Sequence, residues 1–184
     1  QDQEGIGRAR AGACLHMKFV AELYHEQIEG NRYFLHEHPR YATSWQLDCM
    51  KRLQELPDVD TVRGDQCQYG AKTQNSDGVR QKGSPILRPT GSMTNSGETA
   101  KALSRRCEGQ NGQCSRPRGG VHRVCSGKHA RLAQKYPPGL CRAVLRGVRD
   151  QLRADNLLKD GCFGVQAPDD DEKELRGPTT GYTG

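Results

Sequence analysis

The sequence predicts an α/β protein in which helices flank a small sheet. Short apolar runs typical of strands alternate with segments whose apolar residues have helical spacing, in the order helix, strand, helix, strand, strand, helix, helix. The chain has 184 residues, of which 33% are hydrophobic and 5% aromatic. Such a lean composition favours one modest core with long polar loops over two full cores.

The chain opens with a polar stretch and a helix. Residues 1–13 are polar and rich in Gly and Ala, and we expect them to be disordered. A helix is predicted over 15–28, because its apolar residues gather on one face, and Gly30-Asn31 ends it. Those apolar residues are Met17, Phe19, Val20, Leu23, Tyr24 and Ile28.

Three strands and two helices are predicted next. The run 32–37 is apolar at consecutive positions, which is typical of a strand covered on both faces. Trp45 is predicted to lie in the core. The remaining elements, read from apolar spacing and turn residues, are a helix over 45–55, a weaker strand over 59–66, a polar loop over 70–84, a strand over 86–93 and a helix over about 97–106.

The C-terminal part predicts two more helices and a linker. A short helix is expected over 128–136, and Pro137-Pro138 open a second one, as prolines do in a first turn. This second helix carries apolar residues at i, i+3, i+4, i+7 and i+11, which predicts its core-facing side: Cys141, Val144, Leu145, Val148 and Leu152. Residues 157–184 are acidic and Gly-rich, so we expect a linker after a domain spanning 14–156.

Charge and cysteine content narrow the class of protein. Lys and Arg total 28 against 22 Asp and Glu, giving a formal charge of +6, which suits DNA or RNA as a partner. No apolar run approaches the roughly 20 residues that cross a bilayer, and no signal peptide is recognisable. We therefore expect no membrane partner and an intracellular location, nuclear or cytoplasmic. There the eight cysteines serve metal binding or burial rather than disulfides.

A Cys/His-rich segment, 107–129, predicts a zinc site. Cys107, Cys114, His122 and Cys125 form the pattern C-x6-C-x7-H-x2-C, and three thiolates with one imidazole suit tetrahedral zinc. The segment has almost no apolar residues, so a metal would supply the stability that burial cannot. The spacing matches no common zinc finger, and unrelated thiols on a surface loop are the alternative.

Other residues near this pattern were weighed with it. His129 is a substitute ligand. Cys67 follows the second strand without an adjacent base, so we interpret it as structural. The nearby arginines predict either a surface that faces phosphates or a solvated loop: Arg105, Arg106, Arg116, Arg118 and Arg123.

The first strand ends in His36-Glu37-His38-Pro39, which predicts a reaction site. Ligands of α/β sheets lie beyond the carboxyl ends of strands. His36 is expected to face the side of the strand opposite to Glu37. The alternative is a glutamate that caps the next turn or pairs with Arg40.

The order of several short motifs resembles the C-terminal half of cytosine-5 DNA methyltransferases. It also resembles methyltransferase-like segments in polyproteins of copia-type retrotransposons. The motifs are Glu37-His38-Pro39, Gln68-Tyr69-Gly70, Arg88-Pro89-Thr90 with Met93-Thr94-Asn95, and Tyr136 to Ala143 with its Pro-Pro-Gly-Leu-Cys-Arg run. The resemblance spans roughly residues 14–184 and implies part of a Rossmann-like, methyltransferase-type mixed sheet with flanking helices.

The resemblance also implies roles for individual residues. Glu37 would contact the N3 edge of a cytosine flipped out of the duplex, and Arg88 would contact the base or the glutamate. Pro137 and Pro138 would help to close the pocket for S-adenosylmethionine. The residues implied to bind the substrate are His38, Pro39, Tyr69, Gly70, Thr90 and Asn95.

Two departures from the family shape the expected function. His38 replaces the usual Asn, and the family's Pro-Cys nucleophile loop has no counterpart in the chain. We therefore expect the target-binding half of a retroelement-encoded cytosine-5 methyltransferase, inactive as this fragment. Its partners would be DNA or RNA, the missing N-terminal half, and the neighbouring integrase and reverse transcriptase regions. The alternatives are a zinc-dependent nucleic-acid-binding module and a spacer of the polyprotein.

Overall fold

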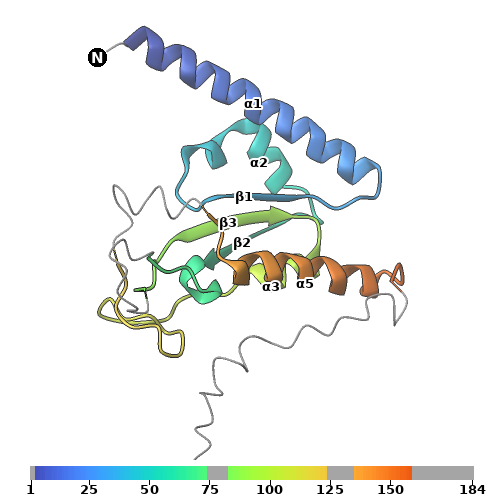
Figure 1. The fold of residues 1–184 in the computed structure, drawn as a ribbon. Helices are drawn as coiled ribbons and strands as arrows, with labels where there is room; N and C mark the ends of the chain where they lie inside the picture. Colours follow the sequence, from blue (N-terminus) through green and yellow to red (C-terminus); the bar gives the residue numbers. More distant parts are fainter. Residues whose placement is uncertain (1–2, 74–82, 124–134, 159–184) are drawn as a thin grey trace, which may run out of the picture.

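A computed structural model describes residues 3–73, 83–123 and 135–158 of the chain, and it has three layers (Figure 1). Two helices, α1 (Gln3–Glu29) and α2 (Asp48–Gln54), lie on one face of a sheet. The helices α3 (Gly97–Leu103) and α5 (Pro138–Ala154) lie on the other. The predicted combination of helices with a small sheet is confirmed, while the Rossmann-like arrangement stays a prediction.

The sheet has three strands, β1 (Leu35–Pro39), β2 (Asp60–Asp65) and β3 (Pro89–Thr94), in the order β1-β3-β2. Two short 3-10 helices, η1 (Thr43–Gln46) and η2 (Gln66–Tyr69), precede α2 and follow β2. Apart from the start of α1, each of these elements lies within a few residues of its predicted position. The predicted helix 128–136 falls largely, and the linker 157–184 almost wholly, outside the described residues.

The direction of the strands differs from the expected mixed sheet. Both β1 and β2 pair with β3 in antiparallel fashion, so β1 and β2 run in the same direction without touching. The chain passes from β1 through α2 to β2, and these two strands do not pair with each other. β3 then inserts between them and runs in the opposite direction. Within the described residues the sheet is therefore wholly antiparallel, although the carboxyl ends of β1 and β2 meet at one edge.

Side chains alternate between the two covered faces of the sheet. His36 is opposite Met93 and Glu37 is opposite Ser92, so neighbouring residues of β1 face different layers, as predicted. The core toward α1 and α2 contains Met17, Ala21, Phe34, Trp45, Met50, Leu53, Val59 and Met93. The core toward α3 and α5 contains Tyr69, Leu103, Leu140 and Ala143, with Leu35, Val62 and Val144 packed against it.

Trp45 belongs to the core, as predicted, and it explains a glycine in the central strand. The Trp45 indole N–H donates to the Pro39 carbonyl at 2.9 Å, while the ring lies over Gly91. A Cβ atom at Gly91 would lie 2.8 Å from Cζ2 of the indole, which is closer than packed atoms approach. Gly91 therefore allows η1 to sit directly on the sheet.

The buried side of α5 differs from the predicted stripe. Leu140, Ala143 and Gly147 face the core, whereas Leu145 is 69% exposed and Cys141, predicted to be core, is exposed. A Cβ atom at Gly147 would lie 2.6 Å from Cα of Thr99, so small residues let α5 approach α3 closely. The core side thus includes the small residues Ala143 and Gly147 beside Leu140, and an apolar count overlooks such small residues.

The start of α1 also differs from prediction. The helix begins at Gln3, although residues 1–13 were expected to be disordered. Ala, Arg and Glu have high helix propensity, which favours continuation of the helix toward the N-terminus beyond its packed part. This extension contributes nothing to the core, because the first buried residue of α1 is Met17.

Candidate metal centre and the adjacent strand end

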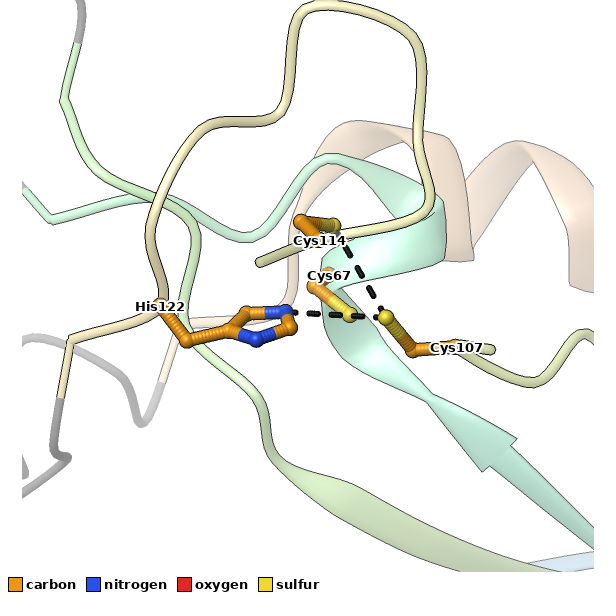
Figure 2. A group of neighbouring side chains, drawn as sticks. All are labelled: Cys67, Cys107, Cys114 and His122. Atoms are coloured by element: carbon orange, nitrogen blue, oxygen red, sulfur yellow. Dashed lines mark hydrogen bonds between the residues drawn. The ribbon is translucent and has the colours of Figure 1, made fainter. Parts of the chain in front are cut away.

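Four side chains from two distant segments form a compact Cys/His group (Figure 2). Cys67 lies on η2, directly after β2, while Cys107, Cys114 and His122 lie on the loop that follows α3. Their ligand atoms all lie within 4.8 Å of one another, and Figure 2 shows the side chains pointing toward one another. This group could bind a metal ion.

Two of the distances between ligand atoms match edges of a tetrahedral zinc site. The Cys107 and Cys114 sulfurs are 3.9 Å apart, and the Cys107 sulfur is 3.6 Å from Nε2 of His122. Zn–S bonds of about 2.3 Å and Zn–N bonds of about 2.0–2.1 Å give tetrahedral edges of about 3.8 Å and about 3.6 Å. The two measured distances therefore agree with the edges that zinc would require.

The membership of the group differs in one place from the pattern read in the sequence. Cys107, Cys114 and His122 come together as expected, while Cys125 and the substitute His129 lie outside the described residues. The fourth member in the structure is Cys67, which was interpreted only as structural. Cys67 lies far along the chain from the other three residues, so no local motif links it to them. Its position just after a predicted strand was the one signal that the sequence offered.

Backbone hydrogen bonds shape the loop that carries three of the four residues. The Cys114 N–H donates to the Gly120 carbonyl at 2.9 Å, and the His122 N–H donates to the Gly112 carbonyl at 2.7 Å. Residues 104–123 include no buried side chain. The arrangement of this loop therefore depends on a few hydrogen bonds and on any metal ion that the Cys/His group binds.

A buried carboxylate connects the loop to the sheet. Asp65, at the end of β2, is fully buried, and its Oδ2 accepts the Cys107 backbone N–H at 2.8 Å. Arg63 donates to Asp65 Oδ1 through Nε at 3.2 Å and Nη2 at 3.1 Å. Asp65 thus holds the backbone of Cys107 by a hydrogen bond from the strand that leads into Cys67.

Burial and hydrogen bonds shift the pKa values of the three thiols in different directions. Burial would raise the pKa of Cys107, but hydrogen bonds from the Ser115 backbone and hydroxyl outweigh it and bring that pKa to about 6. Burial, followed by the neighbouring Cys114 and Cys107, raises the pKa of Cys67. Burial also raises the pKa of Cys114. A cation among the sulfurs would offset the cost of ionising these crowded thiols.

Glu37 lies within β1, two residues before the strand ends and opposite Ser92, and not at the strand end where the sequence predicted it, because β1 continues to Pro39. The Tyr136 hydroxyl donates to Glu37 Oε2, while Glu37 Oε1 is buried and has no hydrogen-bond partner among the described residues. Burial and then the hydrogen bond to Glu37 raise the pKa of Tyr136 to about 12, and the positive charge of Arg88 opposes that rise. Arg88 therefore lies within electrostatic range of the Tyr136–Glu37 pair.

The histidines beside Glu37 belong to the opposite face. Nδ1 of His36 shares a hydrogen bond of 3.0 Å with the Tyr24 hydroxyl, and Nε2 is buried with no hydrogen-bond partner among the described residues. Burial and then the charge of His38 lower the pKa of His36 to about 4. The His38 ring lies 5.7 Å from that of His36, on the side of Trp45. His38 thus faces away from Glu37.

The remaining predicted residues lie in different surroundings. The Tyr69 hydroxyl donates to the Ala102 carbonyl at 3.0 Å, and Thr90 is buried, with its hydroxyl accepting from Gln66 at 3.1 Å. Asn95 follows the far end of β3, where its amide bonds the backbone of Phe34 and Arg32. Asn95 is therefore not brought together with Glu37.

A small pocket of about 220 Å³ opens between η2 and the start of α5. Gly70 and Pro137-Pro138, predicted to serve substrate and cofactor, line it together, with Tyr136 beside them. A Cβ atom at Gly139 would lie 2.3 Å from the Tyr69 carbonyl oxygen, so α5 begins directly against this loop. Pro39 ends β1 at the same edge of the sheet.

Comparisons with known proteins found no matching family model, no matching curated protein and no matching solved structure. Among the residues that the structure describes, none of the helices is both long and apolar enough to cross a membrane.

Proposed function

We propose that this chain is a zinc-dependent nucleic-acid-binding module. The observation that carries the proposal is the grouping of Cys67, Cys107, Cys114 and His122, whose ligand atoms all lie within 4.8 Å of one another. Three sulfurs and one imidazole form a soft ligand set that suits zinc. Four protein ligands leave no open position, which is typical of a structural rather than a catalytic zinc site.

The charge around the Cys/His group supports nucleic acid as the partner. Residues 104–123 contain five arginines and one acidic residue, Glu108. Arg105, Arg106 and Arg123 are exposed on this loop. Arginines on a metal-fixed loop can contact phosphates in DNA or RNA. Zinc would act by holding these arginines in place.

The test measures zinc content and binding to a labelled DNA duplex and to its single strand. We expect one zinc per chain, and binding that is lost with a chelator and falls steeply with salt. The double change Arg105→Gln with Arg106→Gln should weaken binding, while Arg52→Gln, exposed on α2 at the other face, should not. A folded, metal-free chain that binds equally well would refute the proposal.

A second candidate function is the target-binding half of a cytosine-5 DNA methyltransferase in a retrotransposon polyprotein. It is favoured by the grouping of Glu37, Tyr136 and Arg88, and by the buried Oε1 of Glu37, which has no hydrogen-bond partner among the described residues. A carboxyl oxygen of this kind suits contact with an extruded base. Here the sheet would be one part of a Rossmann-like domain completed by the missing half.

In this second function S-adenosylmethionine would supply the methyl group, and Pro137-Pro138 would border its pocket. Integrase and reverse transcriptase regions would be neighbours, in the nucleus or cytoplasm, where thiols stay reduced. We expect Glu37→Ala to abolish methyl transfer by the complete protein without unfolding it. Undiminished turnover would remove this candidate.

A further inference from the structure

We propose that the pocket between η2 and α5 binds one nucleotide of a single-stranded nucleic acid. The phosphate would lie on Lys72 and Lys135, and the base would pack against Tyr136. The inference rests on the proposed nucleic-acid binding and goes further, because it names a second contact region and the form of nucleic acid that it takes.

The charge of the pocket favours an anion. Lys72 and Lys135 line it, and none of its described lining residues is acidic; the Glu37 carboxylate, which is not among them, accepts from the Tyr136 hydroxyl. A Cβ atom at Gly70, another lining residue, would lie 3.1 Å from Nη1 of Arg116, so a third cationic group borders the pocket. The first turn of α5, which begins beside the pocket at Pro137-Pro138, has no acidic residue, so no carboxylate of this turn opposes an anion.

Tyr136 adds an aromatic surface to this basic pocket. Its side chain is 49% exposed, yet its hydroxyl is held by Glu37. An aromatic ring already fixed in this way loses little conformational freedom when a base stacks on it. Alternation of basic and aromatic groups is typical of proteins that bind single strands.

The size of the pocket sets the size of the ligand. Its volume of about 220 Å³ is below the roughly 300–1,000 Å³ of sites for drug-sized molecules. One nucleotide unit of a strand that continues along the surface fits this volume better than a whole cofactor does. A base paired within a duplex could not reach Tyr136 without leaving its stack.

The experiment uses the zinc-loaded full chain and a fluorescent oligothymidylate of about ten nucleotides, within the usual range of site sizes. Tyr136→Ala should weaken binding at least about fivefold, and Tyr136→Phe should retain most of it. Lys72→Gln with Lys135→Gln should reduce the steepness of log affinity against log salt by about 0.7, because the two lysines contact one phosphate of a single strand. Tyr41→Ala and Lys51→Gln, both at exposed positions elsewhere, are the matched controls.

The outcomes separate this inference from the proposed function. Variants that bind like their controls, in a chain that still binds nucleic acid, would overturn the pocket assignment alone. A wild-type chain that binds no nucleic acid would overturn both. Displacement of the probe by inorganic phosphate as readily as by thymidine monophosphate would show a free-phosphate site and would overturn the role of Tyr136.

Discussion

Replacement of Cys67 by serine tests the composition of the metal centre. The structure includes Cys67, whereas the sequence pattern used Cys125 in its place. The two sets share three ligands, so Cys67→Ser and Cys125→Ser give opposite results under the two descriptions. We expect Cys67→Ser to weaken zinc binding strongly and Cys125→Ser to leave it close to wild type.

The magnitude follows from the geometry of the site. Cys67 is almost wholly buried, at 1% exposure, so a serine there leaves three ligands and an open position that water reaches poorly. Loss of an outer-shell partner already costs about 10–100-fold in metal affinity, and loss of a ligand should exceed the upper value. A 100-fold loss removes about 2.7 kcal/mol of the stabilisation that bound zinc gives.

The assay combines zinc titration with hydrogen exchange. On chelation, the amides of Cys114 and His122 should lose protection, because their hydrogen bonds lie within the loop that the metal holds. The amide of Met93, in the central strand, should keep its protection, because both neighbouring strands pair with β3. Cys67→Ser should reproduce the chelated pattern without a chelator.

Cys49→Ser is the matched control, since Cys49 is a half-buried thiol within α2 and outside the Cys/His group. Equal zinc affinity in Cys67→Ser and Cys49→Ser would refute the assignment of Cys67. Loss of zinc binding in Cys125→Ser would refute the set in which Cys67, and not Cys125, is the fourth ligand.

Three further predictions concern the support of this site and of the sheet. Asp65→Asn should weaken zinc binding about 10–100-fold by titration, and an unchanged affinity would show that Asp65 does not position the ligands. Because the pKa of His36 in the fold, about 4, lies below the ordinary 6.5, the unfolded chain takes up a proton first, so stability is complete above about pH 6.5 and is lost toward pH 4. The full pKa shift is worth roughly 3 kcal/mol of unfolding free energy, and partial solvation reduces this to about 2 kcal/mol. In urea denaturation, His36→Phe should make the unfolding free energy nearly independent of pH across this range. An unchanged pH dependence would exclude His36 as its source. Gly91→Ala should cost about 1–3 kcal/mol through its clash with Trp45, whereas Gly97→Ala, with open space around it, should cost little in the same melts.

Local patterns predicted the helices and strands well where apolar residues carried the signal. Phe34, His36 and Met93 face one layer of helices, whereas Leu35 and Val62 face the other. This alternation follows from the pleat of strands that are covered on both faces. The direction of β3 could not be read in the same way, because pattern alone does not say which strands become neighbours.

The site was less predictable than the fold, for two physical reasons. Cys67 joins the other ligands through tertiary structure, and no local spacing encodes a contact between β2 and the loop after α3. The Glu37–Tyr136 pair likewise joins distant positions in the chain. On α5, Ala143 and Gly147 make the close contact, so the more conspicuous Leu145 misled the assignment of the buried side.

The neighbouring sulfurs of Cys67 and Cys107 have a consequence for the path of the chain. Residues 68–106, which lie between them, include the whole of β3 and α3. An ion shared by the two sulfurs would act as a cross-link that closes this segment into a ring, and a ring has fewer unfolded arrangements than an open chain. The central strand could then leave the sheet only with both of its ends held together, so the ion would protect the register of the sheet from a position outside it.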